Sequence, residues 1–135
     1  MKVIIAGSRH LNPFKFFSAQ RRGETTHKLY QIISKHLAHL ESELGRPVTE
    51  IVCGKAQGID TVGEAWAISN GIKVSEFPAE WDLGKHAGFL RNAQMAEYAD
   101  AALVIWDGKS KGSADMLKQM HRLAKPVAIY EMDKL

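Results

Sequence analysis

A segment that could bind an anion follows the most apolar run of the chain. Residues 101–106, Ala-Ala-Leu-Val-Ile-Trp, carry no charged side chain, which is typical of a strand buried on both faces of a parallel sheet. Glycines, hydroxyls and cations come next, and a helical pattern begins near Gly112 or Ser113. The first N–H groups of a helix lack intrahelical partners and carry the positive end of its dipole, so this segment predicts an anion site. Its candidate ligand-binding residues are Asp107, Gly108, Ser110, Gly112 and Ser113.

A second loop with two glycines follows the apolar run at residues 50–53. Its spacing, Gly54-x-x-x-Gly58-x-Asp60, fits neither a Walker A motif nor the dinucleotide fingerprint. Gly54 and Gly58 would let the backbone come close to a ligand. Asp60, in the first turn of the next helix, either caps that helix or accepts a hydrogen bond from a sugar hydroxyl, and both interpretations stay open.

The third candidate loop follows a short apolar run at residues 3–6. Gly7 and Ser8 are small and leave room for a ligand beside Arg9. This arrangement is typical of the first strand-to-helix loop of an α/β protein, and all three residues are candidate ligand-binding residues.

A long polar segment, residues 78–92, leads into another predicted helix. Trp81 either stacks on a base or covers the sheet edge. Arg91, expected in the first turn of the helix, either binds phosphate with its planar guanidinium or forms a salt bridge with Asp82 or Glu80, and phosphate is favoured. The candidate ligand-binding residues here are Trp81, Lys85, Arg91 and Asn92.

These loops need a framework that brings them to one edge of a sheet. Apolar runs near residues 3–6, 50–53, 74–77, 101–106 and 126–130 alternate with helical patterns, one of which is expected to start at Thr25 or Thr26 and to stop at Gly45. The alternation predicts an α/β fold: one Rossmann-like, three-layer domain over residues 1–135 with a five-stranded, mainly parallel sheet. The strand order 3-2-1-4-5 would place the ligand crevice between strands one and four.

Composition narrows the class of protein less than the loops do. The chain has 135 residues and is 45% hydrophobic, so a core can form without disulfides, and its one cysteine, Cys53, is expected to be a buried thiol. We find no signal peptide and no run of about 18 apolar residues, so a cytoplasmic protein without a membrane partner is expected. The formal charge of +3 permits a polyanionic partner without identifying one. The sequence leaves a homo-oligomer open.

Two other features are open to more than one interpretation. Residues 10–23 form an irregular segment in which aromatic and cationic side chains alternate. Such a segment could bind a single-stranded nucleic acid, although a loop folded over its own apolar side chains is favoured. His27, His36 and His39 lie on the predicted first helix without a supporting acidic or cysteine ligand, so no metal site is predicted.

Several motifs taken in order resemble one known family. They are Ser8-Arg9, then Gly54-x-x-x-Gly58-x-Asp60, then Trp81-x-x-x-Lys85-x-Ala87-Gly88-x-x-Arg91-Asn92-x-x-Met95, then Trp106-Asp107-Gly108-x-Ser110-x-Gly112-Ser113. The chain resembles the YspA and cpYpsA-related family of the SLOG superfamily. The resemblance implies a Rossmann-like fold and a nucleotide or nucleotide-derived ligand. Within the superfamily it also implies three activities: ligand sensing, phosphoribohydrolase activity in the Lonely Guy branch, and single-stranded DNA binding in the DNA-processing branch.

The chain departs from the Lonely Guy pattern at one decisive position. Those enzymes carry Pro-Gly-Gly-x-Gly-Thr-x-x-Glu, whereas Met116 stands here at the glutamate position. A thioether neither transfers a proton nor stabilises a ribosyl cation, so that mechanism loses its main carboxylate. Asp107, Glu80 and Asp82 are the substitutes that the sequence offers as catalytic candidates.

The favoured function is therefore binding or sensing of a small phosphate-bearing nucleotide ligand, and no further cofactor is identified. Hydrolysis of a nucleotide N-glycosidic bond is the first alternative. Binding of a single-stranded nucleic acid is the second.

Overall fold

The fold has the elements that the apolar runs predict, in the same order along the chain. The computed structural model describes residues 1–9, 19–55, 58–84 and 86–132. The strands are β1 (Lys2–Gly7), β2 (Glu50–Cys53), β3 (Lys73–Glu76), β4 (Ala101–Trp106) and β5 (Val127–Glu131). The helices are α2 (Ala19–Leu44), α3 (Ile59–Ser69), α4 (Ala87–Tyr98) and α5 (Lys111–Arg122), with the short 3-10 helix η1 (Trp81–Leu83) before α4.

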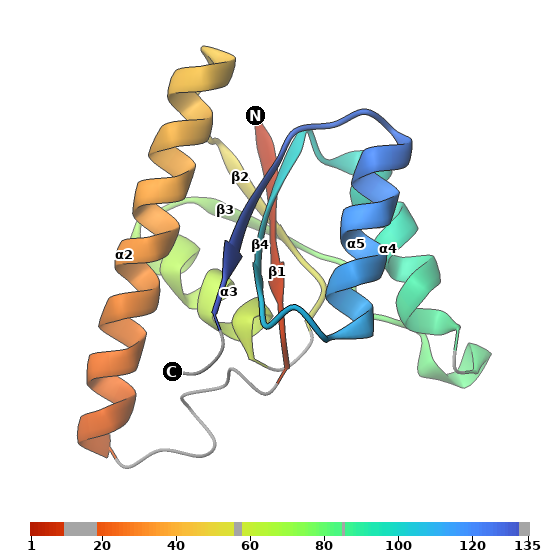
Figure 1. Cartoon of the computed structure of the whole chain (residues 1–135), viewed down its shortest axis with the longest axis horizontal. Coiled ribbons are helices and arrows are strands. Elements are labelled where there is room, and N and C mark those ends of the chain that lie inside the picture. Colours follow the sequence, from red (N-terminus) through yellow and green to blue (C-terminus); the bar gives the residue numbers. More distant parts are fainter. Residues whose placement is uncertain (10–18, 56–57, 85, 133–135) are drawn as a thin grey trace.

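The five strands form one sheet in the order β3-β2-β1-β4-β5, and every pair is parallel (Figure 1). The predicted α/β class, parallel sheet and strand order are confirmed. From β1 the chain crosses through α2 to β2 on one side, whereas β4 pairs with β1 on the other side. The helices that follow β1 and β4 therefore lie on opposite faces of the sheet, and a crevice opens at the carboxyl ends of these two strands.

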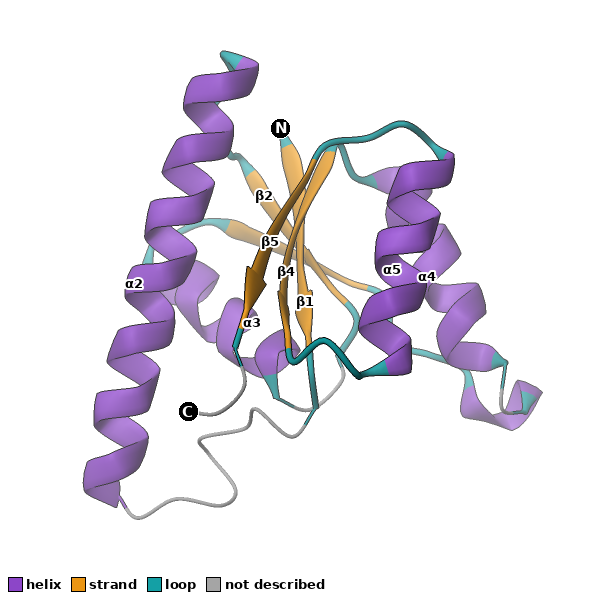
Figure 2. Ribbon diagram, in the orientation of Figure 1, coloured by secondary structure: helices purple, strands orange, loops and turns teal. Residues whose placement is uncertain are grey.

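Alternating side chains of each strand divide the core into two layers. Val3 and Ile5 of β1 pack in the cluster that includes α2 and α3, whereas Ile4 and Ala6 pack in the cluster that includes α4 and α5. Figure 2 shows α2 and α3 on one face of the sheet and α4 and α5 on the other. The inner strands β1, β2 and β4 are buried on both faces because helices cover both, whereas the edge strands β3 and β5 are partly exposed. This burial explains why Ala101–Trp106 is apolar without alternation.

The start of α2 differs from the sequence prediction. Thr25 and Thr26 do not cap the helix, because it already begins at Ala19. The residues before Thr25 include strong helix formers, and Gln20 and Glu24 interact one turn apart, with Nε2 3.4 Å from Oε1. Residues 19–23, expected to be irregular, are therefore helical, while residues 10–18 lie outside the described part of the chain. The helix ends at Leu44, and Gly45 follows with φ 64°, as the sequence predicts.

The long segment before α4 is also shorter than predicted. Helix α4 begins at Ala87, so Arg91 lies in its second turn and not in its first. Figure 1 shows η1 and the start of α4 beside each other at the edge of the molecule. The η1 turn and α4 together orient the side chains that the sequence places in a loop. The bounds of β3 and β5 differ from the predicted ones by a single residue.

Cys53 lies at the end of β2 and is buried. Burial raises the pKa of its thiol to about 11, so the group stays protonated at neutral pH. This agrees with a structural thiol. None of the helices within the described residues is long and apolar enough to cross a membrane.

Candidate functional site

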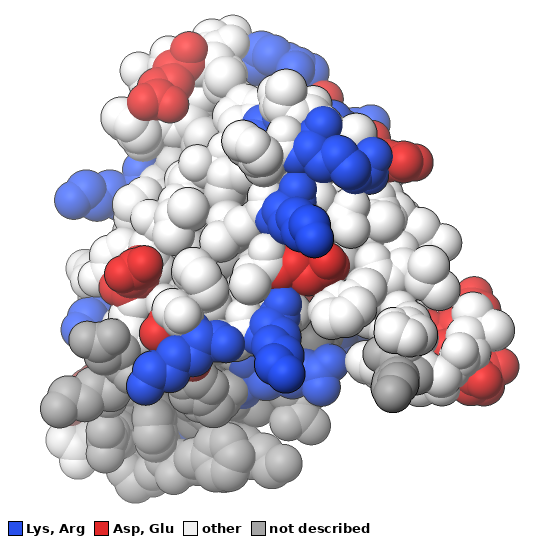
Figure 3. Space-filling model, turned by 45° about the vertical axis from the view of Figure 1, so that its right-hand side comes forward, with Lys and Arg blue, Asp and Glu red and all other residues white. Residues whose placement is uncertain are grey.

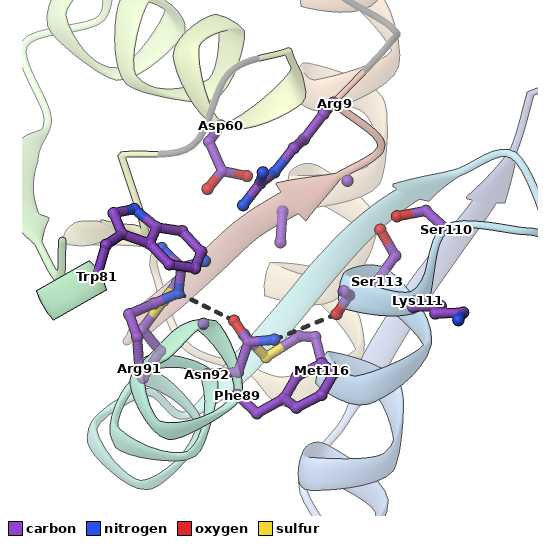
Figure 4. Close-up of a pocket in the computed structure, with 15 residues that line it drawn as sticks. Arg9, Asp60, Trp81, Phe89, Arg91, Asn92, Ser110, Lys111, Ser113 and Met116 are labelled. Carbon is purple, nitrogen blue, oxygen red and sulfur yellow. Dashed lines mark hydrogen bonds between the residues drawn. The ribbon is translucent and has the colours of Figure 1, made fainter. Parts of the chain in front are cut away.

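A cavity of about 300 Å³ opens at the carboxyl ends of β1 and β4 (Figure 4). Ala6, Gly7 and Arg9 line it from the end of β1, and Asp60 lines it from the first turn of α3. The remaining walls come from η1, α4 and α5. The cavity thus lies at the topological switch point, where ligands of open α/β sheets bind.

The first turn of α5 forms one wall through Ser110, Lys111, Gly112 and Ser113. Within the described chain, no side chain caps this helix end. Asp107 instead accepts hydrogen bonds from the N–H groups of Lys109 and Ser110, 2.9 and 2.8 Å from its Oδ1, and so shapes the loop ahead of the helix. The N–H groups of the first turn are consequently available to a ligand that accepts hydrogen bonds.

Ser113 adds a hydroxyl to this wall. The residue is only 3% exposed, and its Oγ is the one buried side-chain N or O atom of the described residues that makes no hydrogen bond. A buried hydroxyl without a partner is unfavourable by roughly 1–3 kcal/mol. A bound acceptor such as a phosphate oxygen would remove this penalty.

Arg91 and Asn92 form a hydrogen-bonded link across the cavity floor (Figure 4). Arg91 is 8% exposed, and its guanidinium donates from Nη1 to the carbonyl of Gly54 and from Nε to Oδ1 of Asn92, at 3.1 Å for the latter. The Nδ2 of Asn92 donates to the carbonyl of Gly112, at 3.2 Å, and to Oδ2 of Asp115, at 3.0 Å. Through these hydrogen bonds the amide of Asn92 ties α4 to the first turn of α5.

The charge of Arg91 is affected most by its burial. Burial lowers the pKa of its guanidinium, the carboxylate of Asp60 acts in the opposite direction, and the nearby charge of Arg9 lowers it further. The expected alternative, a salt bridge with Glu80 or Asp82, is not among the ion pairs of the described residues, and the carbonyl of Gly54 is the partner instead. An anion in the cavity would offset the burial of this charge.

Arg9 and Trp81 stand at the mouth of the cavity. The Cζ atom of Arg9 lies 5.5 Å from the centroid of the Trp81 ring, a cation–π distance. Figure 4 shows Asp60 and Arg9 extending toward each other on the same side of the cavity. Trp81 is 55% exposed, so a large part of its ring is free to stack on a ligand.

Three of the candidate glycines are required by the packing of the protein itself. A Cβ on Gly7 would lie 2.7 Å from Cβ of Ile59 and would also meet the carbonyl oxygen of Ile105, and one on Gly54 would meet the guanidinium of Arg91. A Cβ on Gly58, whose φ is 80°, would lie 2.5 Å from the carbonyl oxygen of Ser8. Gly112 differs, because a Cβ there would find no atom within 4 Å.

The candidate residues divide between the cavity and the loops around it. Those that line the cavity are Gly7, Arg9, Asp60, Trp81, Arg91, Asn92, Ser110, Gly112 and Ser113. Ser8, Gly54, Gly58, Asp107 and Gly108 belong to the surrounding loops, and the Oγ of Ser8 accepts from the N–H of Asp107 at 3.1 Å. Lys85 lies outside the described residues. The catalytic candidates Asp107, Glu80 and Asp82 are not among the residues that line the cavity.

Sequence reasoning missed several lining residues. They are Ala6, Gly88, Phe89, Met95 and Lys111, and Met116 was considered only as the replacement of a glutamate. Lys111 directly follows Ser110 at the start of α5, so the predicted anion site could have included it. Gly88 and Met95 stand in the motifs of the family resemblance and could have been included as well. Ala6 and Phe89 gave no such signal, because apolar residues at these positions are equally typical of a core.

Comparison with known families gives a match. The model of the YspA, cpYpsA-related SLOG family matches residues 1–84. The chain belongs to this family. A comparison with curated proteins gave no match.

The family match covers some of the residues that line the cavity of this SLOG family member and leaves the others outside it. Gly7, Arg9, Asp60 and Trp81 lie within the matched residues, whereas the lining residues of α4 and α5 come after residue 84. The α4 and α5 walls are therefore known from the geometry of this chain alone.

Proposed function

We propose that this chain binds a phosphate-bearing nucleotide or nucleotide derivative in the cavity between the ends of β1 and β4. The observation that carries the proposal is the buried, unpartnered Ser113 hydroxyl at the first turn of α5. Arg91 and Lys111 add positive charge to the same cavity. Together they supply the donors and the charge that a phosphate group requires.

Other lining residues fit the remaining parts of a nucleotide. Trp81 offers an exposed ring for a base, and Asp60 offers an acceptor for a sugar hydroxyl. The volume of about 300 Å³ is at the lower end of the range for ligand cavities, roughly 300–1,000 Å³. It suits a mononucleotide better than a dinucleotide.

Calorimetric titration of the purified chain with a panel of nucleoside monophosphates and the matching nucleosides tests the proposal. We expect at least one nucleotide to bind, and to bind more tightly than its nucleoside. Mass spectrometry of small molecules released from the purified protein identifies a ligand that is retained during purification. Equal affinity for nucleotide and nucleoside would remove the phosphate from the proposal.

Replacing Arg91 with lysine tests the role of its planar guanidinium. Arg91→Lys keeps the charge but loses the forked donors, so phosphorylated ligands should bind about tenfold more weakly, equivalent to ~1.4 kcal/mol, while nucleosides bind nearly as before. Parallel titrations of nucleotide and nucleoside isolate the phosphate contribution. Arg122→Lys, an exposed arginine that contacts Gln119, is the matched control and should change neither affinity. An equal loss for both ligands would mean that Arg91 only shapes the cavity.

Hydrolysis of a nucleotide N-glycosidic bond is the second candidate function, and one observation favours it. Asp60 is a carboxylate that lines the cavity and is 5% exposed. Met116, which also lines the cavity, supplies no acid or base at the position where Lonely Guy enzymes have glutamate. Binding without hydrolysis is therefore the favoured function.

Incubation with nucleoside monophosphates distinguishes binding from hydrolysis. We expect no release of free base above the spontaneous rate, measured by chromatography. Turnover that Asp60→Asn abolishes would establish hydrolysis with Asp60 as the catalytic carboxylate. Turnover that survives this change would direct attention to Asp107, and Asp107→Asn is the next variant.

A further inference from the structure

The outer face of α5 carries a row of positive charge. Lys111, Lys118 and Arg122 are spaced i, i+7 and i+11, which places them within about 40° of one another around the helix. Lys109 lies just before the helix, and all four side chains are exposed. We call Lys109, Lys111, Lys118 and Arg122 the α5 stripe. Figure 3 shows Lys and Arg side chains gathered in a column over this helix, interrupted by an acidic side chain.

The α5 stripe is not neutralised by the protein. Elsewhere on the surface, Arg46, Lys55 and Lys73 form ion pairs with carboxylates. No ion pair found among the described residues involves a cation of the stripe. The guanidinium of Arg122 donates to the neutral amide of Gln119, from Nη2 at 3.1 Å and from Nε at 3.3 Å. The stripe therefore presents its positive charge to solvent and to an anionic partner.

Asp115, the one carboxylate within α5, is engaged on the cavity side. Asp115 accepts the hydrogen bond from Nδ2 of Asn92 at 3.0 Å. Its acceptor oxygen Oδ2 is directed toward α4. Asp115 thus reduces the positive charge of this face at one position.

The stripe is continuous with the cavity. Lys111 belongs to both, since it lines the cavity and begins the row. At a rise of 1.5 Å per residue, the row from Lys111 to Arg122 extends about 16 Å, which is long enough to contact more than one phosphate of a nucleic acid strand. A ligand whose phosphate lies at the first turn of α5 could therefore continue along the helix.

The surroundings favour a nucleic acid over a lipid surface. Trp81 and Phe89 line the cavity and are 55% and 42% exposed, so bases can stack on them. The apolar residues of α5, among them Met116 and Met120, are buried in the core. The helix thus offers no apolar face that would insert into a membrane.

We infer that the α5 stripe binds the phosphates of a single-stranded nucleic acid whose terminal phosphorylated nucleotide occupies the cavity. This inference rests on the proposed function, because the cavity holds the first nucleotide. It assigns the following phosphates to Lys118 and Arg122, which lie beyond the cavity.

A length series of ligands tests the inference. The probes are 5′-phosphorylated homo-oligoribonucleotides of each base, from the mononucleotide to the hexanucleotide, titrated at low and at physiological salt. We expect affinity to rise with length by roughly tenfold over the series, with a steeper salt dependence of about 0.7 in the log–log slope for each added phosphate contact.

Charge reversal on the stripe provides the discriminating variant. Lys118→Glu combined with Arg122→Glu should leave mononucleotide affinity unchanged and abolish the gain with length, because neither residue lines the cavity. The matched control is Lys28→Glu combined with Lys35→Glu, two exposed lysines seven residues apart on α2, across the sheet. It changes the net charge equally and should keep the gain with length. Circular dichroism of all variants checks the fold.

The outcomes separate this inference from the function on which it rests. Mononucleotide binding without any gain with length, or a gain that persists in the α5 variant, would overturn the inference alone. Failure of every probe to bind would reject the proposed function as well. Binding of anionic phospholipid vesicles that is lost in the α5 variant, without a gain for oligonucleotides, would replace the nucleic acid with a membrane.

Discussion

Replacing Gly112 with aspartate is expected to abolish nucleotide binding while the protein stays folded. The aspartate would place a negative charge at the first turn of α5, where the free N–H groups, Lys111 and the Ser113 hydroxyl favour an anion. The new carboxylate would compete with the phosphate for these donors and repel it. We expect a loss of at least about a hundredfold in affinity, equivalent to ~2.7 kcal/mol, because direct contacts are lost together with the favourable dipole.

Gly112→Ala separates the effect of charge from the effect of size. A Cβ at this position meets no atom within 4 Å, and alanine is the better helix former. The alanine variant should therefore bind nucleotides within a few fold of the native chain and unfold at the same or a higher temperature. Calorimetric titration and thermal unfolding of both variants provide the measurements. Full affinity in Gly112→Asp would move the phosphate away from α5.

Replacing Gly7 with alanine should reduce the stability of the protein, whereas both changes at Gly112 leave it folded. A Cβ there would lie 2.7 Å from Cβ of Ile59 and would overlap the carbonyl oxygen of Ile105. Both neighbours belong to the core, where β1, β4 and α3 meet, and the backbone oxygen cannot turn aside as a flexible side chain can. Overpacking of this kind should lower the free energy of unfolding by about 3 kcal/mol or more.

Chemical denaturation of Gly7→Ala beside Gly112→Ala measures the contrast. Both changes add one methyl group to a glycine that lines the cavity, so ligand contact alone would make them alike. We expect only Gly7→Ala to shift the denaturation midpoint strongly. A stable Gly7→Ala variant with impaired nucleotide binding would instead assign Gly7 to the ligand.

The architecture follows from the sequence because its signals are local or depend on a simple rule. Apolar runs such as Ala101–Trp106 indicate doubly buried strands, and the helical patterns between them require parallel pairing. The switch between the first and fourth strands then places their loops together, and the cavity is found there. The family resemblance, which the match to residues 1–84 supports, implied the same Rossmann-like fold.

Helix boundaries were less predictable because several nearby residues compete to begin or end a helix. Thr25 is a good N-cap by type, yet the helix formers before it extend α2 back to Ala19, and Thr25 is buried on the core side of the helix. The same competition affects the position of Arg91. Because α4 starts at Ala87, Arg91 lies in the second turn of the helix and not in the predicted first turn.

The sequence by itself determined the fold class, the strand order and the edge of the sheet at which the candidate side chains gather. Only the tertiary structure decided what each side chain contacts, because those contacts join residues far apart in the chain. Arg91 reaches the carbonyl of Gly54, and Asn92 reaches the first turn of α5. Gly54 and Gly112 are alike as residue types, but one faces a guanidinium and the other an open cavity. Residue type and spacing specify a position along the chain, whereas the space around that position depends on the packing of all the elements together.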